Sequence, residues 1–259
     1  MMKIVVCVKQ VPDTTEIKID PVKNTLIRTG VPSILNPFDR NAVETALQLK
    51  DTYGGEVTVL SMGPPQAKAV LREALSMGAD RAYLITDRAF GGSDTYATSY
   101  ILSSAIRHLG PFDVVLGGKQ AIDGDTGQTA PSIAEHLDMI RLTYIMSMEI
   151  EGDKVIAKRQ VEVIEARLPV LCTATKETNK PRYATIRGKL ESLKAEIPEL
   201  TLEDMKDIID TTKIGLKGSP TKVKATFTPK RTATGVRIEG GPQKMAASLL
   251  DCLKESKVL

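Results

Sequence analysis

The stretch EVTVLSMGPPQAKAVLREALSMGADRAYLIT, residues 56–86, contains two short apolar runs on either side of an amphipathic segment. The runs at 56–62 and 81–86 have the length and apolar content that predict strands buried on both faces. Between them, four apolar residues recur at helical spacing: Val70, Leu71, Ala74 and Leu75. Because parallel strands need a crossover that is usually a helix, this stretch predicts one strand–helix–strand unit of a parallel sheet.

The same alternation continues on both sides of this unit. Strand-like runs cover residues 3–8 and 112–118, and a helix is predicted between Asn36, as its cap, and Gly54, as its stop. Residues 94–109 give a further helix. Regular alternation of strands and helices predicts an α/β class fold with a doubly wound, mostly parallel, Rossmann-like sheet.

The remaining segments depart from this alternation. Residues 15–30 hold two alternating runs around a turn and predict a surface hairpin. After a helix expected to begin near Thr126, residues 142–175 supply more strands, which we expect to extend the sheet in antiparallel fashion. Prolines and lysines then interrupt the periodicity, so we expect an α/β domain over residues 1–190 and a partner-wrapping C-terminal arm over residues 191–259 that ends in an amphipathic helix.

Composition excludes several classes of protein. The chain of 259 residues is 42% hydrophobic and 26% charged, and it has no apolar run near the roughly 18 residues that a membrane span needs. The amino terminus lacks the pattern of a secretory signal, so we expect a cytoplasmic protein. A net charge of +3 with 4% aromatic residues argues against nucleic-acid binding. Three cysteines without C-x-x-C spacing indicate neither a disulfide framework nor a metal site.

The stretch GKQAIDGDTGQTAP, residues 118–131, is the first candidate site. Ligands of open α/β sheets bind beyond the carboxyl ends of the strands, and this stretch follows such a strand. Gly124 and Gly127 let the backbone approach a ligand, while the next helix offers unpaired amides to an anion. The spacing fits neither the Rossmann nor the P-loop fingerprint, and Gln128 stands where an EF-hand loop needs glycine. The alternative is an ordinary Asp/Gly-rich turn that caps a helix.

Two carboxylates, Asp123 and Asp125, lie in this candidate anion site. We expect them to turn outward, to cap the helix or to bind loop amides. The backbone amides of residues 124–128 and the hydroxyls of Thr126 and Thr129 then remain to hold a pyrophosphate.

Two further sequence features bear on a catalytic role. The loop FGGSDT, residues 90–95, is similar to the loop of ATP pyrophosphatases, although Phe90 replaces its leading serine. This keeps an ATP pyrophosphatase-like enzyme as a remote alternative, beside the interpretation that Ser93 or Asp94 caps the next helix. No Ser/His/Asp or Cys/His set occurs at the predicted strand ends, so no residue is assigned a catalytic role.

The basic stretch KETNKPRYATIRGK, residues 176–189, follows an apolar strand-like run. It presents Ile186 between Arg182 and Arg187, and an apolar tip with an arginine rim is a common composition at protein interfaces. The stretch is either a solvated loop or a docking segment for a partner protein.

Taken in order, these segments resemble the β subunit of electron transfer flavoproteins over nearly the whole chain. The matching segments are VCVKQVPDT, NPFDRNAVETAL, SMGPPQA, EALSMGADRAYLITD, GKQAIDGDTGQTAP and LPVLCTATKETNKPRYATI. The resemblance implies an adenine-nucleotide-binding α/β fold that pairs, as a heterodimer, with an α subunit carrying FAD. It also implies AMP in the β subunit of respiratory-type members and a second FAD in that of the electron-bifurcating group.

The resemblance assigns site residues position by position. The family's nucleotide site falls on Cys7, Lys9, Asn36, Met62, Gly63, Asp123, Gly124, Asp125, Thr126, Gly127, Gln128 and Thr129. Its dehydrogenase-docking loop falls on Pro181, Arg182, Tyr183, Ile186, Arg187 and Lys189, with Ile186 as the anchor. One departure concerns residues 157–171, which are shorter than the family's acidic turn and lack its glycine pair, so the local hairpin geometry differs.

The sequence DGDTGQ, residues 123–128, resembles the bifurcating type more than the respiratory type. This implies FAD as the bound cofactor and NAD(H) as a substrate of the complex. One electron then passes to ferredoxin or flavodoxin and the other to a flavin-containing dehydrogenase, and the chain is not catalytic alone. The alternatives are a non-bifurcating subunit with structural AMP, which shuttles electrons from acyl-CoA-type dehydrogenases, and a nucleotide-binding module without a redox role.

Overall fold

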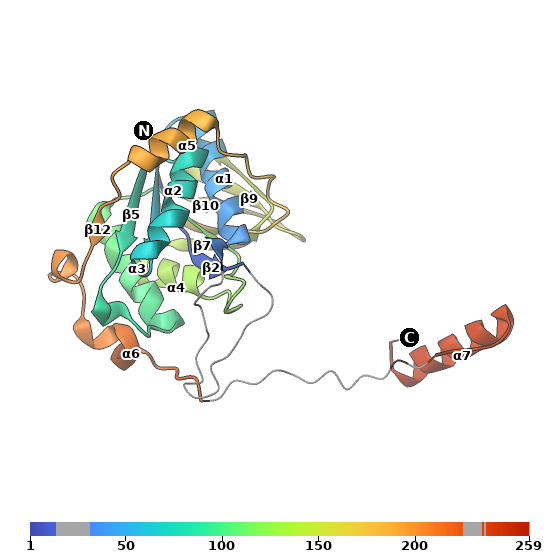
Figure 1. The fold of residues 1–259 in the computed structure, drawn as a ribbon. Coiled ribbons are helices and arrows are strands. Elements are labelled where there is room, and N and C mark those ends of the chain that lie inside the picture. Colours follow the sequence, from blue (N-terminus) through green and yellow to red (C-terminus); the bar gives the residue numbers. More distant parts are fainter. Residues whose placement is uncertain (14–31, 225–234, 236, 259) are drawn as a thin grey trace. The chain divides into compact units, whose positions relative to one another are not determined.

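The computed structural model describes residues 1–13, 32–224, 235 and 237–258. The chain divides into two units, Met1–Lys222 and Val223–Leu259; Figure 1 labels their α-helices and some of the strands. The hairpin predicted for residues 15–30 lies outside the described residues. On either side of it, β2 (Gln10–Pro12) and β3 (Ser33–Leu35) pair in antiparallel fashion.

A seven-stranded sheet forms the centre of the first unit, with the strand order β12-β5-β4-β1-β6-β11-β7. Every neighbouring pair in it is parallel, which confirms the predicted α/β fold. Its strands are β1 (Lys3–Cys7), β4 (Glu56–Met62), β5 (Arg81–Ile85), β6 (Val114–Gly118), β7 (Ile140–Ile145), β11 (Val170–Ala174) and β12 (Glu199–Leu200).

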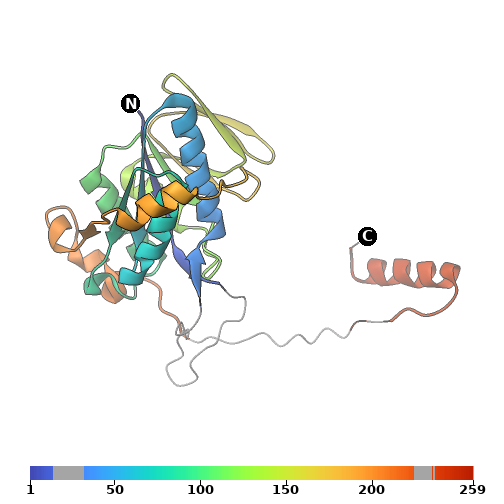
Figure 2. The ribbon, with the colours of Figure 1, turned by 45° about the horizontal axis from the view of Figure 1, so that its top comes forward.

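Helices cover both faces of this sheet (Figures 1 and 2). The main helices are α1 (Pro37–Tyr53), α2 (Lys68–Met77), α3 (Thr95–Leu109) and α4 (Thr129–Leu137). Two successive residues of β1 point to opposite faces of the sheet. Val6 packs in a core with α1 and α2, while Val5 packs in a core with α3 and α4. Strands buried on both faces are the reason that these segments appear as continuous apolar runs.

The antiparallel strands are present, but they form a sheet of their own. This sheet consists of β8 (Ser147–Glu151), β9 (Lys154–Lys158) and β10 (Val163–Arg167). The prediction that these strands extend the central sheet in antiparallel fashion is therefore wrong. The strands that do extend it beyond β6, β11 and β7, are parallel to their neighbours. The burial patterns explain the difference, since β11 is buried along its whole length whereas β10 alternates and leaves one face to solvent.

Residues 191–222 pack with the first unit, so the boundary expected at residue 190 falls inside it. In this stretch β12 pairs with β5 and adds an edge strand to the central sheet. The shorter elements of the first unit are η1 (Pro65–Ala67), η2 (Arg88–Phe90), η3 (Glu203–Met205), η4 (Thr211–Lys213), α5 (Ile186–Lys194) and α6 (Gly215–Gly218).

The second unit contains the predicted closing helix, α7 (Pro242–Glu255). Its apolar residues Met245, Leu249 and Leu250 are exposed. No helix in the described ranges combines the length and apolar character needed to cross a membrane.

Candidate functional site

The candidate site lies where the carboxyl ends of three neighbouring strands meet. Because β1 pairs in parallel with both β4 and β6, the residues that follow these strands share one edge of the sheet. The structure thus brings together Lys9 after β1, Met62 and Gly63 at the end of β4, and Gly118 at the end of β6. The chain connections diverge on the two sides of β1, and ligands of such sheets bind at this kind of position.

A buried carboxylate, Asp39, joins the ends of β1 and β6. Its Oδ2 accepts a hydrogen bond from the Lys9 amide at 2.8 Å and its Oδ1 accepts one from the Gly118 amide at 3.1 Å. Only 6% of Asp39 is exposed, and this burial raises its pKa to about 7, against the lowering effect of the hydrogen bonds it accepts. Asp39 therefore fixes the spacing of the two strands that flank the site.

Glycine is required at position 118 because of this contact. A Cβ atom there would lie 2.4 Å from Oδ1 of Asp39 and 2.6 Å from the carbonyl carbon of Phe38. Asp39 is not among the site residues predicted from the sequence. The available signal was an acidic residue in the first turn of a predicted helix, which on its own indicates only favourable helix electrostatics.

Asp123 forms an ion pair with Lys9. The Lys9 Nζ atom lies 2.7 Å from Oδ1 and 2.9 Å from Oδ2 of Asp123. The Asp123 side chain is 8% exposed and the Lys9 side chain 47% exposed, so the carboxylate is enclosed and the ammonium group still reaches solvent. The charge of Asp123 is thus compensated within the protein.

Asp125 is held by a neighbour in the same loop, since Gln120 Nε2 donates a hydrogen bond to its Oδ1 at 2.8 Å. Its φ angle of 50° is in the left-handed region, which a non-glycine residue such as aspartate visits only at specific turns. The expectation that Asp123 or Asp125 caps the next helix is wrong, because Gln128 occupies the N-cap position of α4 and no side chain bonds that helix end.

Asn36 anchors the loop that follows β6. It occupies the N-cap position of α1, as predicted, but its side chain makes no capping hydrogen bond. Instead Asn36 Nδ2 donates to the carbonyl of Gln120 at 2.9 Å, and its Oδ1 accepts from the amide of Ile122 at 3.2 Å. Asn36 is fully buried, so its own side-chain amide needs these partners, and the two bonds fix the loop to the start of α1.

The open donors of the site lie at the start of α4. This helix begins at Thr129, later than the predicted start near Thr126. Within the described part of the chain, the amides of residues 126–130 donate no hydrogen bond, and Pro131 has no N–H. The amides of Gly124 and Asp125, which were also expected to hold the pyrophosphate, instead donate to the carbonyl of Ala121 at 3.3 and 2.9 Å. Unpaired amides at a helix amino terminus form a binding site for an anion.

The loop also leaves room for a ligand. A Cβ atom added to Gly124 would meet no heavy atom within 4 Å, and Gly127 adopts a φ of +62° that favours glycine. Thr126 and Gln128 are exposed and Thr129 is half-buried. This donor set and this space fit a phosphate or diphosphate group.

The other predicted site residues line the strand ends without free polar groups. Cys7 and Met62 pack partly against the core on the α3 and α4 side, while Gly63 donates its amide to the carbonyl of Ile85 at 3.1 Å. Burial, and secondarily the charge of Asp39, raises the pKa of Cys7 to about 12, which keeps this thiol protonated and unreactive. Cys7 and Met62 can contribute shape to the site but no acid–base chemistry.

The GGSDT loop caps the amino terminus of α3 through Asp94. Oδ1 of Asp94 accepts from the amide of Ala97 at 3.0 Å, and its Oδ2 accepts from the Thr221 amide and hydroxyl at 2.9 and 2.7 Å. These partners favour the interpretation of Asp94 as a helix cap over the pyrophosphatase alternative. No cluster of His, Cys, Asp or Glu suited to a metal ion occurs among the residues that the structure covers.

The predicted docking segment leads into a helix. Its Pro181 and Arg182 are half-buried, whereas Tyr183 is 92% exposed and Ile186 85% exposed. Ile186 begins α5, which Thr185 caps by accepting from the Gly188 amide at 2.9 Å. Lys189 of the segment is exposed as well.

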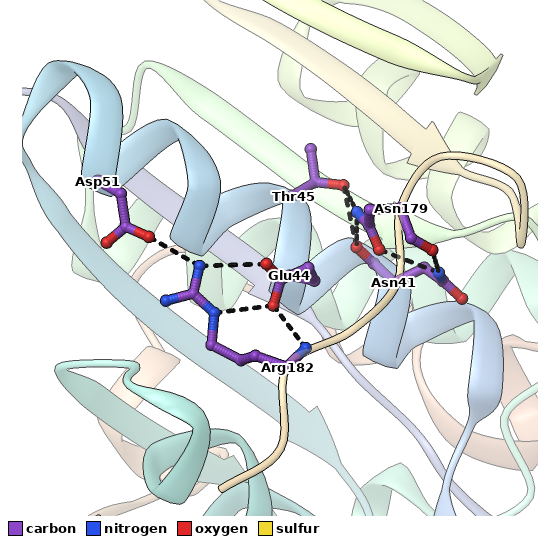
Figure 3. A network of polar contacts seen from close by, with 6 residues as sticks. All are labelled: Asn41, Glu44, Thr45, Asp51, Asn179 and Arg182. Carbon is purple, nitrogen blue, oxygen red and sulfur yellow. Dashed lines mark hydrogen bonds and ion pairs between the residues drawn. The ribbon is translucent and has the colours of Figure 1, made fainter. Parts of the chain in front are cut away.

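Two arginines of this segment are engaged within the chain. Arg182 was expected at the rim of an interface, but it is bound to Glu44 and Asp51, as Figure 3 shows. Arg187 Nε pairs with Glu191 Oε1 at 2.8 Å.

Two exposed leucines extend the apolar surface of α5. Leu190 and Leu193 follow Ile186 at helical spacing and are also exposed. Together with Tyr183 they form an apolar stripe, defined here as Tyr183, Ile186, Leu190 and Leu193. Neither leucine is among the predicted docking residues, because residues 176–189 were interpreted as a loop. The spacing of Ile186, Leu190 and Leu193 is nevertheless a helical signal.

Comparison with known proteins agrees with this arrangement. Residues 23–205 match the family described as the electron transfer flavoprotein domain. The chain is 51% identical over 263 residues to electron transfer flavoprotein subunit beta of Thermoanaerobacterium thermosaccharolyticum, with all of both chains covered. It is 48% identical over 264 residues to caffeyl-CoA reductase-Etf complex subunit CarD of Acetobacterium woodii, again with both chains fully covered.

A relative from another group is similar over slightly less of its length. Protein FixA of Bradyrhizobium diazoefficiens is 44% identical over 260 residues, which are 96% of this chain and 90% of that protein. Family match, identity and coverage together show that this chain belongs to the electron transfer flavoprotein family, among its β subunits.

Proposed function

We propose that this chain binds FAD at the ends of β1, β4 and β6 and takes part in electron bifurcation in the cytoplasm. Membership of the family makes it an electron-transfer subunit that works with an α subunit and a dehydrogenase. The proposed complex oxidises NADH, passes one electron to ferredoxin or flavodoxin, and passes the other through the α subunit to a flavin-containing dehydrogenase.

The observation that supports FAD most directly is the placement of the two loop carboxylates. Asp123 is paired with Lys9, so its charge is compensated within the protein. Asp125 accepts a hydrogen bond from the uncharged amide of Gln120, which holds its carboxylate in the loop. An uncompensated carboxylate 4 Å from a phosphate charge would cost about 1 kcal/mol in water and about 4 kcal/mol near a protein surface. With the charge of Asp123 compensated, the open amides of residues 126–130 provide donors for a diphosphate.

FAD, when bound, supplies the one- and two-electron chemistry of the subunit, and the residues of the chain bind and orient it. The amides at the start of α4 hold the diphosphate, and the hydroxyls of Thr126 and Thr129 add donors beside them. Asn36 fixes the loop that carries these groups, while Asp39 fixes the strand ends below it. Lys9 is half-exposed, so its ammonium group can share its charge between Asp123 and a phosphate oxygen.

We assign the docking of the dehydrogenase to the apolar stripe on α5. Apolar residues of a helix normally face the core, yet Ile186, Leu190 and Leu193 face solvent. The exposed lysines Lys180, Lys189 and Lys194 flank the stripe. This composition suits an apolar pocket with an acidic rim on the partner. The name of the relative CarD, a subunit of a caffeyl-CoA reductase-Etf complex, supports a partner that acts on a CoA thioester.

We assign the contact with the α subunit to the second unit, Val223–Leu259, which is the part of the expected C-terminal arm that lies outside the first unit. Its helix α7 carries exposed Met245, Leu249 and Leu250 on an amphipathic pattern. A helix whose apolar residues are exposed in the isolated chain gains stability by packing them against a partner.

The proposal is tested by mixing the purified αβ complex with NADH, ferredoxin and a CoA-thioester-linked dehydrogenase. We expect ferredoxin to be reduced only when both NADH and the dehydrogenase in its oxidised, electron-accepting form are present. Electron transfer between the dehydrogenase and the α subunit without any NADH-linked ferredoxin reduction would contradict bifurcation and leave the general family role intact.

A further inference from the structure

Helix α1 holds the segment before the apolar stripe through a set of polar contacts, drawn in Figure 3. The contacts involve Asn41, Glu44, Thr45 and Asp51 of α1 and, from the segment, Asn179 and Arg182. The two partners are far apart in sequence, so these contacts fix one part of the fold on another. The apolar stripe begins directly after Arg182, at Tyr183.

Glu44 is the centre of this set. Arg182 Nε donates to Glu44 Oε2 at 2.9 Å, and Arg182 Nη2 donates to Glu44 Oε1 at 3.1 Å. The backbone amide of Arg182 donates to the same Oε2 at 2.9 Å. Since the Glu44 side chain is only 5% exposed, this bidentate ion pair fixes both the guanidinium group and the backbone of Arg182.

Asp51 binds the same arginine from the exposed side. Arg182 Nη2 donates to Asp51 Oδ2 at 2.7 Å, and the Asp51 side chain is 58% exposed. Solvent screens an exposed ion pair of this kind, so Asp51 contributes less to the placement of Arg182 than Glu44 does.

A reciprocal amide pair holds the segment a few residues earlier. Asn41 Nδ2 donates to the carbonyl and the Oδ1 of Asn179 at 2.9 and 3.0 Å. Asn179 Nδ2 donates in return to the carbonyl of Asn41 at 3.0 Å and to Thr45 Oγ1 at 2.9 Å. The segment is therefore bound to α1 at two points, residues 179 and 182.

The stripe is also fixed at its far end. Gly188 of α5 approaches α2 so closely that an added Cβ would lie 2.5 Å from the carbonyl oxygen of Ser76. The Arg72 guanidinium of α2 donates to the carbonyl of Ala195 at 3.1 Å, just after α5. Tyr183 and Ile186 lie between these anchors and keep their side chains in solvent.

Burying a carboxylate such as that of Glu44 is unfavourable unless the carboxylate is paired. A surface segment can be attached to a helix without a buried ion pair, so the presence of one here needs a reason. A rigid segment, in contrast, loses little conformational entropy when a partner binds it. We propose that Glu44 and Arg182 are positioning residues that hold the apolar stripe in its docking conformation, which rests on the docking function proposed above.

The test uses the full αβ complex and a purified acyl-CoA dehydrogenase, taken from a panel as one with which the unmodified complex exchanges electrons. Glu44→Gln keeps the shape of the side chain but loses the charge and one acceptor oxygen. Arg182→Lys, a second variant in case the first does not fold, keeps the charge but loses the bidentate geometry. Asp80→Asn is the control, because Asp80 binds a lysine of α1, Lys50, and a backbone amide, that of Val57, away from the segment.

Two readouts are measured on each variant. Amide hydrogen exchange in residues 179–185, without the dehydrogenase, should become faster in Glu44→Gln and Arg182→Lys and stay unchanged in Asp80→Asn. The KM for the dehydrogenase should rise roughly tenfold in the first two variants, with kcat and flavin content unchanged, because the cost falls on docking alone.

Unchanged exchange or an unchanged KM in both variants overturns the positioning role. Ile186→Ala distinguishes this failure from that of the docking function. If Ile186→Ala raises the KM and Glu44→Gln does not, only the positioning role is wrong. If Ile186→Ala also leaves the KM unchanged, the docking assignment fails and the positioning role fails with it.

Discussion

Lys9 and Asp123 come from segments more than a hundred residues apart, yet Lys9 Nζ lies 2.7 Å from Oδ1 of Asp123. Asp123 belongs to the loop that leads to the open amides at the start of α4. The pair explains how an acidic, glycine-rich loop can serve as an anion site. One carboxylate is enclosed and compensated, and its cationic partner remains half-exposed next to the proposed position of the diphosphate. The acidic composition of the loop is thus compatible with an anionic ligand.

The ion pair leads to the first prediction. Lys9→Met should weaken FAD binding by roughly tenfold or more, about 1.4 kcal/mol, because it removes a cation and leaves Asp123 buried without a partner. Asp123→Asn should leave the affinity unchanged or increase it, because it frees Lys9 for the phosphates. Fluorescence titration of the flavin-free complex with FAD measures both effects. An equal loss of affinity in Asp123→Asn would show that Asp123 contacts the ligand directly.

The second prediction compares two glycines of the same region. Gly118→Ala should destabilise the protein by about 2 kcal/mol or more, since its Cβ would overlap Asp39 and Phe38. Gly124→Ala should change the free energy of unfolding by less than about 0.5 kcal/mol, because its Cβ meets no atom within 4 Å. Urea denaturation of the full-length chain measures both, and equal destabilisation by the two substitutions would refute the assigned packing at Gly118.

The third prediction concerns the pH dependence of stability. The pKa of Asp39 is raised from 3.8 to about 7 by burial, so between these pH values the folded chain binds a proton that the unfolded chain releases. The stabilising contribution of this group is therefore complete below about pH 4 and is lost as the pH rises through about 7. The difference corresponds to at most about 4 kcal/mol.

Asp39→Asn removes this titration. Denaturation of the full-length chain at several values between pH 5 and pH 8 should show a free energy of unfolding that falls less steeply in the variant than in the unmodified chain. The comparison of the two slopes cancels the other titrating groups. Parallel slopes would mean that Asp39 ionises normally in the folded protein.

The fourth prediction concerns the apolar stripe. Ile186→Ala should raise the KM for the dehydrogenase by roughly 5- to 30-fold, as expected for truncation of a central interface residue costing about 1–2 kcal/mol. Leu190→Ala should have a smaller effect in the same direction, because Leu190 is less exposed than Ile186. Flavin content should not change in either variant, and a loss of flavin from Ile186→Ala would show that this residue has another role.

Local signals in the sequence predicted the central elements well. The runs that became β1, β4, β5 and β6 are apolar because both sheet faces are covered, and cap and stop residues marked α1 and α3. The antiparallel strands were also recognised, but not that they leave the central sheet. Which strand lies next to β6 in the central sheet depends on contacts between distant parts of the chain. The neighbour of β6 is β11, and no local pattern in the sequence encodes this pairing.

The candidate site shows the same limit at the level of single residues. The glycines, threonines and acidic residues of the loop were visible as a motif, because backbone approach and helix amides follow from local spacing. The roles of Asp39, Asn36 and Glu44 depend on contacts with residues 30 to 138 positions away. Such roles require the tertiary structure, since a polar residue in or before a helix has the same local signature whether it faces solvent, caps that helix or binds a distant loop.

The central claim, FAD rather than AMP at the ends of β1, β4 and β6, is tested most directly by the cofactor content of the purified αβ complex. The complex is denatured, and the released nucleotides are separated and quantified against the protein concentration. The account predicts two FAD and no AMP per heterodimer. One FAD together with one AMP per heterodimer would contradict it.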